Sequence, residues 1–327
     1  MSESTDKLSV SCSLGGKSKP RPLPRSLALL PCLLVICLAG EGCSVRRYAL
    51  NKASDALAQS GTSFSSDDDP ELIKSAAPFS LKLMESLLAE NPKHVGLLTA
   101  SASGFTQYSY AFVQQEADEI EPRDLAAAEA LRARARRLYL RAQKYGLRGL
   151  DVEHPGFSES LRKDPKAAVR VTTKPDVPLL YWTAAAWASA ISLSKDNPEV
   201  LGQIPEMEAL IFRALELDES YGAGAIHTFM IAYEMGKPGA AGDPAARARQ
   251  HFDRALILSQ GNDASPLVAL AEAVTIQKQD AKEFESLLNR ALALDPDAHP
   301  DNRLLNTVMQ RRARWLLSRK SELFLPE

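Results

Sequence analysis

The sequence predicts an all-α fold, and three observations lead to that prediction. Ala and Leu dominate the chain, and long stretches hold few β-branched residues. No segment alternates apolar and polar residues in the way that indicates a sheet. Internal repeats are the third observation, because RALELD at 213–218 recurs as RALILS at 254–259 and as RALALD at 290–295.

The repeated segments have the pattern of the second helix of a tetratricopeptide unit, Y-x-x-A-L-x-L-x-P, whose period is about 34 residues. We expect the apolar residues three positions before each alanine, Ile211, Phe252 and Leu288, to occupy equivalent interior positions. Further second-type helices are expected at 83–92 and 139–146, and first-type helices at 95–118, 178–195, 222–236 and 265–279. The sequence therefore predicts an α-solenoid of tetratricopeptide-like helical hairpins, with a Gly/Pro-rich insertion at 236–243.

Composition and charge exclude several classes of protein. The chain has 327 residues, of which 45% are hydrophobic and 24% charged, and this excludes a disordered tail, a collagen and a polytopic membrane protein. Its 39 basic and 41 acidic side chains give a formal net charge of -2. A nearly neutral chain lacks the electrostatic footprint of a nucleic-acid binder, so we expect no nucleic-acid partner.

The amino-terminal segment has the features of a bacterial export signal. A basic stretch precedes an apolar run from Leu27 to Ala39, which suits the core of a signal peptide and is too short to span a bilayer. The last of the four cysteines is Cys43, so a chain cleaved before it keeps one thiol and forms neither an internal disulfide nor a zinc tetrad. A lone cysteine after such a run is the pattern of a lipoprotein, and lipidation of Cys43 is predicted.

Simple secretion and an inactive signal are the alternatives, since GEG replaces the usual lipobox before Cys43. The predicted organisation is a signal peptide over 1–42, an anchor helix and linker over 43–69, and the helical repeat domain over 70–327. At the start of that domain, Asp69 is expected to cap a helix with Pro70 at its first position. The acidic run 67–69 lacks the alternating ligands of a calcium loop.

Motifs for catalysis are missing from the sequence. None of the five histidines falls in an HExxH motif, and the chain has no GxSxG elbow, P-loop or strand-linked GxGxxG. We therefore expect no enzymatic activity, no cofactor and no metal site. An enzyme stays an alternative only through carboxylates and histidines that the sequence cannot bring together.

Amphipathic aromatic and amide side chains are the candidates for a ligand path. Such residues combine an apolar body with a polar tip, and small residues on the same helices leave room for a cavity. Ordinary core packing is the competing interpretation of the aromatic stripes, as an interior position is for the histidine. The candidates are Gln107, Tyr108, Tyr110, Gln114, Tyr181, Trp182 and His227.

Two arginine-rich runs, 131–148 and 310–320, admit two interpretations. The arginines either line solvated helix faces or form a basic lip that attracts an acidic partner. On the second interpretation, the candidate partner contacts are Arg311, Arg312 and Arg314.

Several segments together resemble the TRAP-transporter-associated TPR lipoproteins, the T components of tripartite ATP-independent periplasmic transporters. The resemblance extends over nearly all of the chain after the signal segment and is most specific in GFTQY, YWTAAAWA and RRARWLL. It implies a lipid-anchored periplasmic α-solenoid, a homotrimer, a tunnel through each protomer and association with the solute-binding subunit of the transporter. It also implies an apolar or carboxylated small ligand. Because Ser44 stands where an aspartate marks inner-membrane retention, the inner leaflet of the outer membrane is the expected location.

We therefore expect an accessory component of a TRAP-type transporter that docks the solute-binding subunit and channels a small ligand. The alternative is a generic TPR scaffold that assembles cell-envelope proteins without binding a ligand. A tunnel lined by the aromatic residues of 105–114 and 181–187 would favour the first function over the second.

Overall fold

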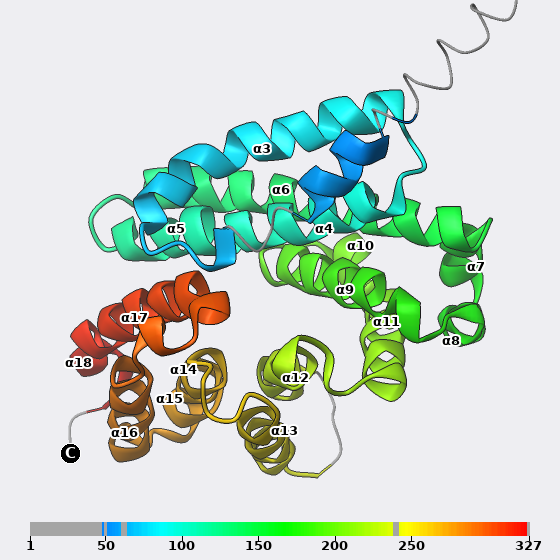
Figure 1. Cartoon of the computed structure of the whole chain (residues 1–327). Helices are drawn as coiled ribbons and strands as arrows, with labels where there is room; N and C mark the ends of the chain where they lie inside the picture. Colours follow the sequence, from blue (N-terminus) through cyan, green and yellow to red (C-terminus); the bar gives the residue numbers. More distant parts are fainter. Residues whose placement is uncertain (1–47, 49–50, 60–63, 238–241, 326–327) are drawn as a thin grey trace, which may run out of the picture. The chain divides into compact units, whose positions relative to one another are not determined.

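The computed structural model describes residues 48, 51–59, 64–237 and 242–325 of the chain, and all regular structure in these ranges is helical (Figure 1). The chain divides between Ala49 and Leu50, and the unit that begins at Leu50 contains all the elements below. The predicted signal peptide, the 42/43 boundary and Cys43 lie outside the described residues. The all-α prediction is confirmed.

The first half of the unit begins with a helical segment at 51–58 and then holds the longest helices. Its α-helices are α3 (Pro70–Glu90), α4 (Val95–Ser109), α5 (Gln115–Ile120), α6 (Leu125–Glu153), α7 (Phe157–Lys163), α8 (Pro165–Ala168) and α9 (Val177–Ser192). A π-helical segment, η1 (Tyr110–Gln114), joins α4 to α5, and the 3-10 turns η2 (Val169–Val171) and η3 (Lys174–Asp176) lead from α8 to α9.

The second half holds shorter helices. They are α10 (Pro198–Leu201), α11 (Ile204–Leu217), α12 (Ala225–Gly236), α13 (Pro244–Leu258), α14 (Ser265–Leu270), α15 (Ile276–Lys278), α16 (Ala281–Leu292), α17 (Arg303–Ser318) and α18 (Lys320–Leu323). A second π-helical segment, η5 (Ala271–Thr275), joins α14 to α15, and the 3-10 turns are η4 (Tyr221–Ala223), η6 (Pro296–Ala298) and η7 (Pro300–Asn302).

Aspartate caps mark the beginning of the second helix in several pairs. As predicted, Asp69 caps α3 by accepting hydrogen bonds from the Glu71 and Leu72 amides, with Pro70 at the first position. Asp124, Asp243 and Asp280 cap α6, α13 and α16 in the same way. Each cap satisfies backbone donors that a helix leaves unpaired, which fixes where the helix begins.

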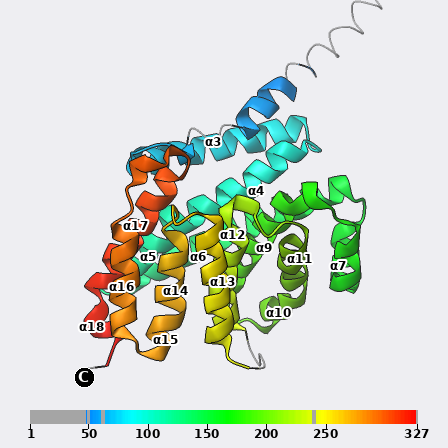
Figure 2. The same cartoon turned by 60° about the horizontal axis from the view of Figure 1, so that its bottom comes forward.

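Successive long helices pack against one another along the chain. In the first half, α3 contacts α4, α4 contacts α6, α6 contacts α9, and α9 contacts α11. In the second half, α12 contacts α13, α13 contacts α14, α14 contacts α16, and α16 contacts α17. Figure 2 shows α12, α13, α14 and α16 side by side. Alternate helices also touch, as α4 does with α9 and α12 with α14. These contacts are those that stacked hairpins make, while the tetratricopeptide-like superhelix stays a prediction.

The repeat register places its interior residues correctly. Ile211 and Leu288 are fully buried and Phe252 is 8% exposed, each within an apolar cluster of the unit. The three residues lie in α11, α13 and α16, the second helices of their pairs. The prediction that these three residues are interior is confirmed, and their equivalence within a tetratricopeptide-like repeat stays a prediction.

The C-terminal helix α17 reaches back to the first helices of the unit. It contacts α3, and Arg311 donates to both carboxylate oxygens of Glu119, with distances of 2.8 Å from Nε and 2.6 Å from Nη2. The Arg303 Nη1 atom donates to the Ser66 carbonyl at 2.9 Å. These contacts bring the last repeat next to the first and form one wall of a cavity.

Candidate functional site

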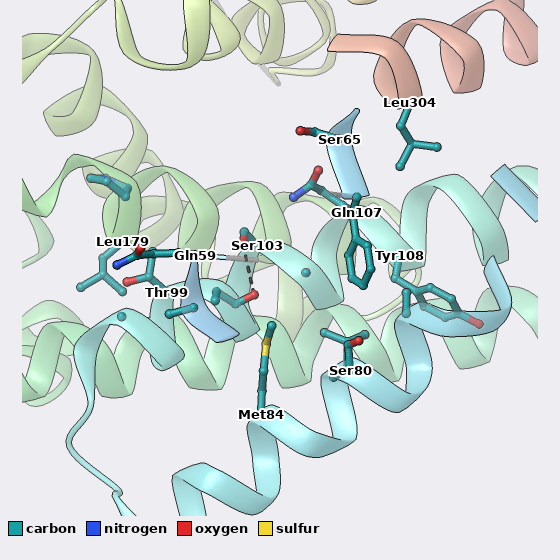
Figure 3. A pocket seen from close by; sticks show the side chains of 18 of the residues that line it. Gln59, Ser65, Ser80, Met84, Thr99, Ser103, Gln107, Tyr108, Leu179 and Leu304 are labelled. Carbon is teal, nitrogen blue, oxygen red and sulfur yellow. Dashed lines mark hydrogen bonds between the residues drawn. The ribbon is translucent and has the colours of Figure 1, made fainter. Parts of the chain in front are cut away.

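A cavity of about 710 Å³ lies where the first helices and α17 meet. Its walls come from the 51–58 segment, α3, α4, η1, the 175–179 stretch and α17 (Figure 3). The volume is in the range of pockets that take small molecules. Helices that are far apart in the sequence therefore line one cavity.

The lining is mainly apolar, with hydroxyl and amide groups spread over it. Three small residues of α4, Ala100, Ser103 and Gly104, belong to the lining, and at Gly104 the helix packs closely against Leu81 of α3. The apolar residues include Ile73, Leu81, Met84, Phe112, Leu179, Leu304, Leu305 and Val308, and the polar ones include Gln59, Ser65, Ser80, Thr99 and Ser103. An apolar body with scattered polar groups is typical of a site for a small apolar ligand.

Three of the seven predicted path residues line this cavity: Gln107, Tyr108 and Tyr110. Tyr108 is 8% exposed, and its ring packs against Phe112 with centroids 5.7 Å apart. Burial raises the pKa of Tyr110 to about 12, so its hydroxyl stays protonated at neutral pH. In Figure 3, Gln107 and Tyr108 lie with Leu304 at one end of the cavity.

Three further predicted residues lie outside the cavity lining. Gln114 accepts a hydrogen bond from the Tyr139 hydroxyl at 2.8 Å. Tyr181 and Trp182 pack edge to face, and the Trp182 indole donates to the Tyr221 hydroxyl at 3.1 Å. For Tyr181 and Trp182, the packing interpretation describes their surroundings better than a ligand path does.

His227 also lies outside the cavity and pairs with a second histidine. Its Nδ1 atom is 2.8 Å from Nδ1 of His251 on α13, and its Nε2 atom is 3.2 Å from the Glu219 carboxylate. Burial lowers the pKa of both histidines, and Glu219 partly offsets this effect at His227. The pair joins α12 to α13, a contact that the sequence did not reveal.

The three predicted partner-contact arginines have different surroundings. Arg311 is half-buried and bound to Glu119, and Arg312 is buried between Asp118 and Glu272 and stacks 4.3 Å over the Trp315 ring. Arg314 is exposed. Arg311 and Arg312 thus hold α17 in place, which leaves Arg314 as the arginine most open to a partner.

Several lining residues were not among the predicted ones. Leu304, Leu305 and Val308 come from α17, and Asp55 and His94 from the first helices of the unit. The small residues of α4 were the signal for room beside that helix, but nothing in the sequence indicated that α17 covers it.

Metal and membrane sites were also sought in the described residues. No group of three or more His, Cys, Asp or Glu side chains within them could hold a metal ion. Within the same ranges, no helix combines the length and hydropathy that a membrane crossing needs.

Comparison with known proteins identifies the family. The model of the TRAP transporter T-component family (TAtT) matches residues 66–324. An uncharacterized protein of Treponema pallidum (strain Nichols) is 30% identical over 307 residues, which cover 88% of this chain and 95% of that protein. The matched region includes α3 to α18 completely, and with them the cavity lining from Ile73 onward. The chain therefore belongs to the TRAP transporter T-component family.

Proposed function

We propose that this T component holds a small apolar ligand in the cavity between α3, α4 and α17 while it docks the solute-binding subunit of its transporter. The observation that carries the proposal is the cavity itself, with about 710 Å³ and a mainly apolar lining. Hydroxyl and amide groups of the lining, such as those of Thr99, Ser103 and Gln107, can orient a ligand.

A matched pair of substitutions on α3 tests ligand binding. Ser80 lines the cavity, whereas Ser86 is exposed and lies outside the lining. Ser80→Trp should fill part of the cavity and weaken binding of the neutral fluorescent probe N-phenyl-1-naphthylamine at least tenfold, while Ser86→Trp should bind it as the wild type does. Circular dichroism checks that both variants are folded.

Two outcomes would contradict the ligand proposal. The probe could fail to bind the wild-type chain, or both tryptophan variants could bind it equally well. Either result would support the alternative function, a TPR scaffold that assembles cell-envelope proteins without a ligand.

Docking is proposed to use the exposed face of α17, with Arg314 as a contact for an acidic patch. Arg314→Glu should weaken co-purification of the solute-binding subunit and leave the helix content unchanged, because Arg314 is exposed. A homotrimer and a tunnel through each protomer belong to the same proposal. Unchanged co-purification would place the docking face elsewhere.

Attachment to the periplasmic face of the outer membrane through a lipidated Cys43 completes the proposed function. Cys43→Ala should release the protein into the soluble periplasmic fraction, because two or more acyl chains are needed for firm anchoring. Fractionation with immunoblotting measures this, and a membrane-bound alanine variant would contradict it.

A further inference from the structure

The charges that line the cavity are of one sign. Asp55, Glu153 and Asp176 line it, and His94 is the single imidazole, whereas neither Lys nor Arg occurs among its described lining residues. A carboxylate ligand buried there would meet acidic groups and no permanent cation.

His94 does not supply the missing positive charge. Its Nδ1 atom accepts a hydrogen bond from the Leu97 amide at 3.1 Å, and its Nε2 atom faces Asp55 at 3.1 Å. A ring that accepts at Nδ1 carries its proton on Nε2 and is neutral. The imidazole therefore caps α4 and donates to Asp55, and it leaves no donor for a ligand.

The other carboxylates keep their end of the cavity acidic. Asp176 accepts hydrogen bonds from the Thr173 amide at 2.7 Å and from its hydroxyl at 3.2 Å, and Glu153 is exposed. The Oδ2 atom of Asp176 also lies 3.1 Å from His154 Nε2, and His154 is outside the cavity lining. Asp176 also stands at the N-terminus of α9, where it complements the positive end of the helix dipole. That position would otherwise attract an anionic ligand.

Cations close to the cavity are bound to other parts of the chain. Arg148 donates to the Pro92 carbonyl at 2.7 Å, and Arg303 pairs with Asp297 at 2.8 Å. Arg134 approaches the Tyr108 hydroxyl at 3.5 Å but is not part of the lining. Arg134, which lies beside the lining residue Tyr108, is therefore the cation that we test as a hidden counter-ion.

The two ends of the cavity differ in character. In Figure 3, Leu179, Gln59 and Thr99 lie at one end, and Tyr108 and Leu304 lie at the other. Asp176 is three residues from Leu179, and His94 stands at the start of the helix that carries Thr99, so the acidic groups gather at the Leu179 end. A ligand with a polar head would place that head at the Leu179 end of the cavity.

We infer, on the basis of the ligand-binding function proposed above, that the cavity takes apolar molecules with an uncharged polar head and rejects carboxylates. A medium-chain alcohol fits this class, whereas the fatty acid of the same length does not. The charges of the lining thus restrict the predicted ligand class, which was apolar or carboxylated small molecules, to apolar and uncharged ones.

Competition between two ligands of equal chain length tests the inference on the full chain. Decanol and decanoate are titrated at pH 8 against bound N-phenyl-1-naphthylamine. Decanol should displace the probe, and decanoate should need at least a thirtyfold higher concentration. Equal displacement of the probe by decanol and decanoate would overturn the inference. If decanoate displaced the probe from the wild type but not from Arg134→Gln, Arg134 would be identified as its counter-ion.

A charge-introducing variant provides a gain-of-binding test at the acidic end. Thr99→Lys should improve displacement by decanoate at least tenfold, whereas the neutral control Thr99→Gln should not. If neither variant changes the preference and the wild type binds both ligands, the inference is wrong although the cavity binds ligands. If the probe never binds the wild type, the proposed function itself fails.

Discussion

Helices α6 and α9 approach each other so closely at Gly146 that a single added methyl group should be measurable. A Cβ atom built on Gly146 would overlap the Thr183 hydroxyl and lie 3.0 Å from Thr183 Cβ and 3.3 Å from Thr183 Cα. Thr183 is fully buried and its hydroxyl already donates to the Leu179 carbonyl at 2.5 Å. Since the backbone of α9 is among the atoms met, rotation of one side chain does not remove the overlap.

The magnitude follows from two opposing effects. Overpacking of this kind costs about 1–3 kcal/mol. Replacement of Gly by Ala within a helix returns up to about 1 kcal/mol. We therefore expect Gly146→Ala to lower the free energy of unfolding by about 1–2 kcal/mol.

Gly236 at the end of α12 provides the matched control. A Cβ atom there would meet no atom of the described residues within 4 Å, so Gly236→Ala should leave the stability unchanged or raise it by up to about 1 kcal/mol. Urea unfolding followed by circular dichroism at 222 nm compares the two variants.

A second substitution isolates the contact between the two helices. Thr183→Gly removes the atoms that the new methyl group would meet, so the double variant should lose less stability than the sum of the single variants. If Gly146→Ala proves as stable as Gly236→Ala, α6 and α9 do not pack as described, and the reasoning is refuted.

Three further predictions concern the interior of the unit. Phe252→Ala should cost about 3–5 kcal/mol of unfolding free energy, and a loss below about 1 kcal/mol would contradict the repeat register. Arg312→Met should cost about 1–3 kcal/mol in the same urea assay, because Glu272 loses its ion pair with Arg312 and Asp118 keeps only its ion pair with Arg132, and wild-type stability would show that the Arg312 contacts are dispensable. The lowered pKa values of His227 and His251 mean that the fold favours their neutral forms. Their stabilisation is complete above the ordinary histidine pKa of about 6.5 and is lost as the pH falls through the lowered values. The urea concentration at the unfolding midpoint should therefore decrease when the pH is lowered from 7.5 to 5, and it should decrease less in His251→Gln. An equal decrease in the wild type and in His251→Gln would exclude this histidine pair as the cause.

Local patterns were sufficient to predict much of the fold. The cap at Asp69 depends on neighbouring residues only, and the burial of Ile211 and Leu288 follows from the repeat period. Both features are set within one or two helical turns, which is the range over which sequence periodicity carries information.

The cavity could be predicted only in part, because its walls come from distant segments. The polar tips of Tyr108 and Gln107 and the small residues of α4 indicated the right helix. The position of α17 depends on how all the helices between α4 and α17 pack, and contacts such as Arg311–Glu119 leave no local pattern. His227 and His251 likewise meet only because α12 and α13 pack together.

A competing apolar surface on α3 determines which measurement is the most decisive. Leu72, Phe79 and Leu83 are 55%, 73% and 39% exposed and face away from the cavity lining. A lipophilic molecule that binds the chain could attach to this outer stripe instead of entering the cavity. The location of bound ligand therefore matters more than binding alone.

Photolabelling of the full chain with a decanol that carries a diazirine tests the central claim most directly. Peptide mass spectrometry should find the label on Met84, Tyr108 and Leu304, and excess decanol should suppress it, because these residues of α3, α4 and α17 line one cavity. Labelling confined to the outer stripe of α3, or labelling that decanol does not reduce, would contradict the claim that the cavity holds the ligand.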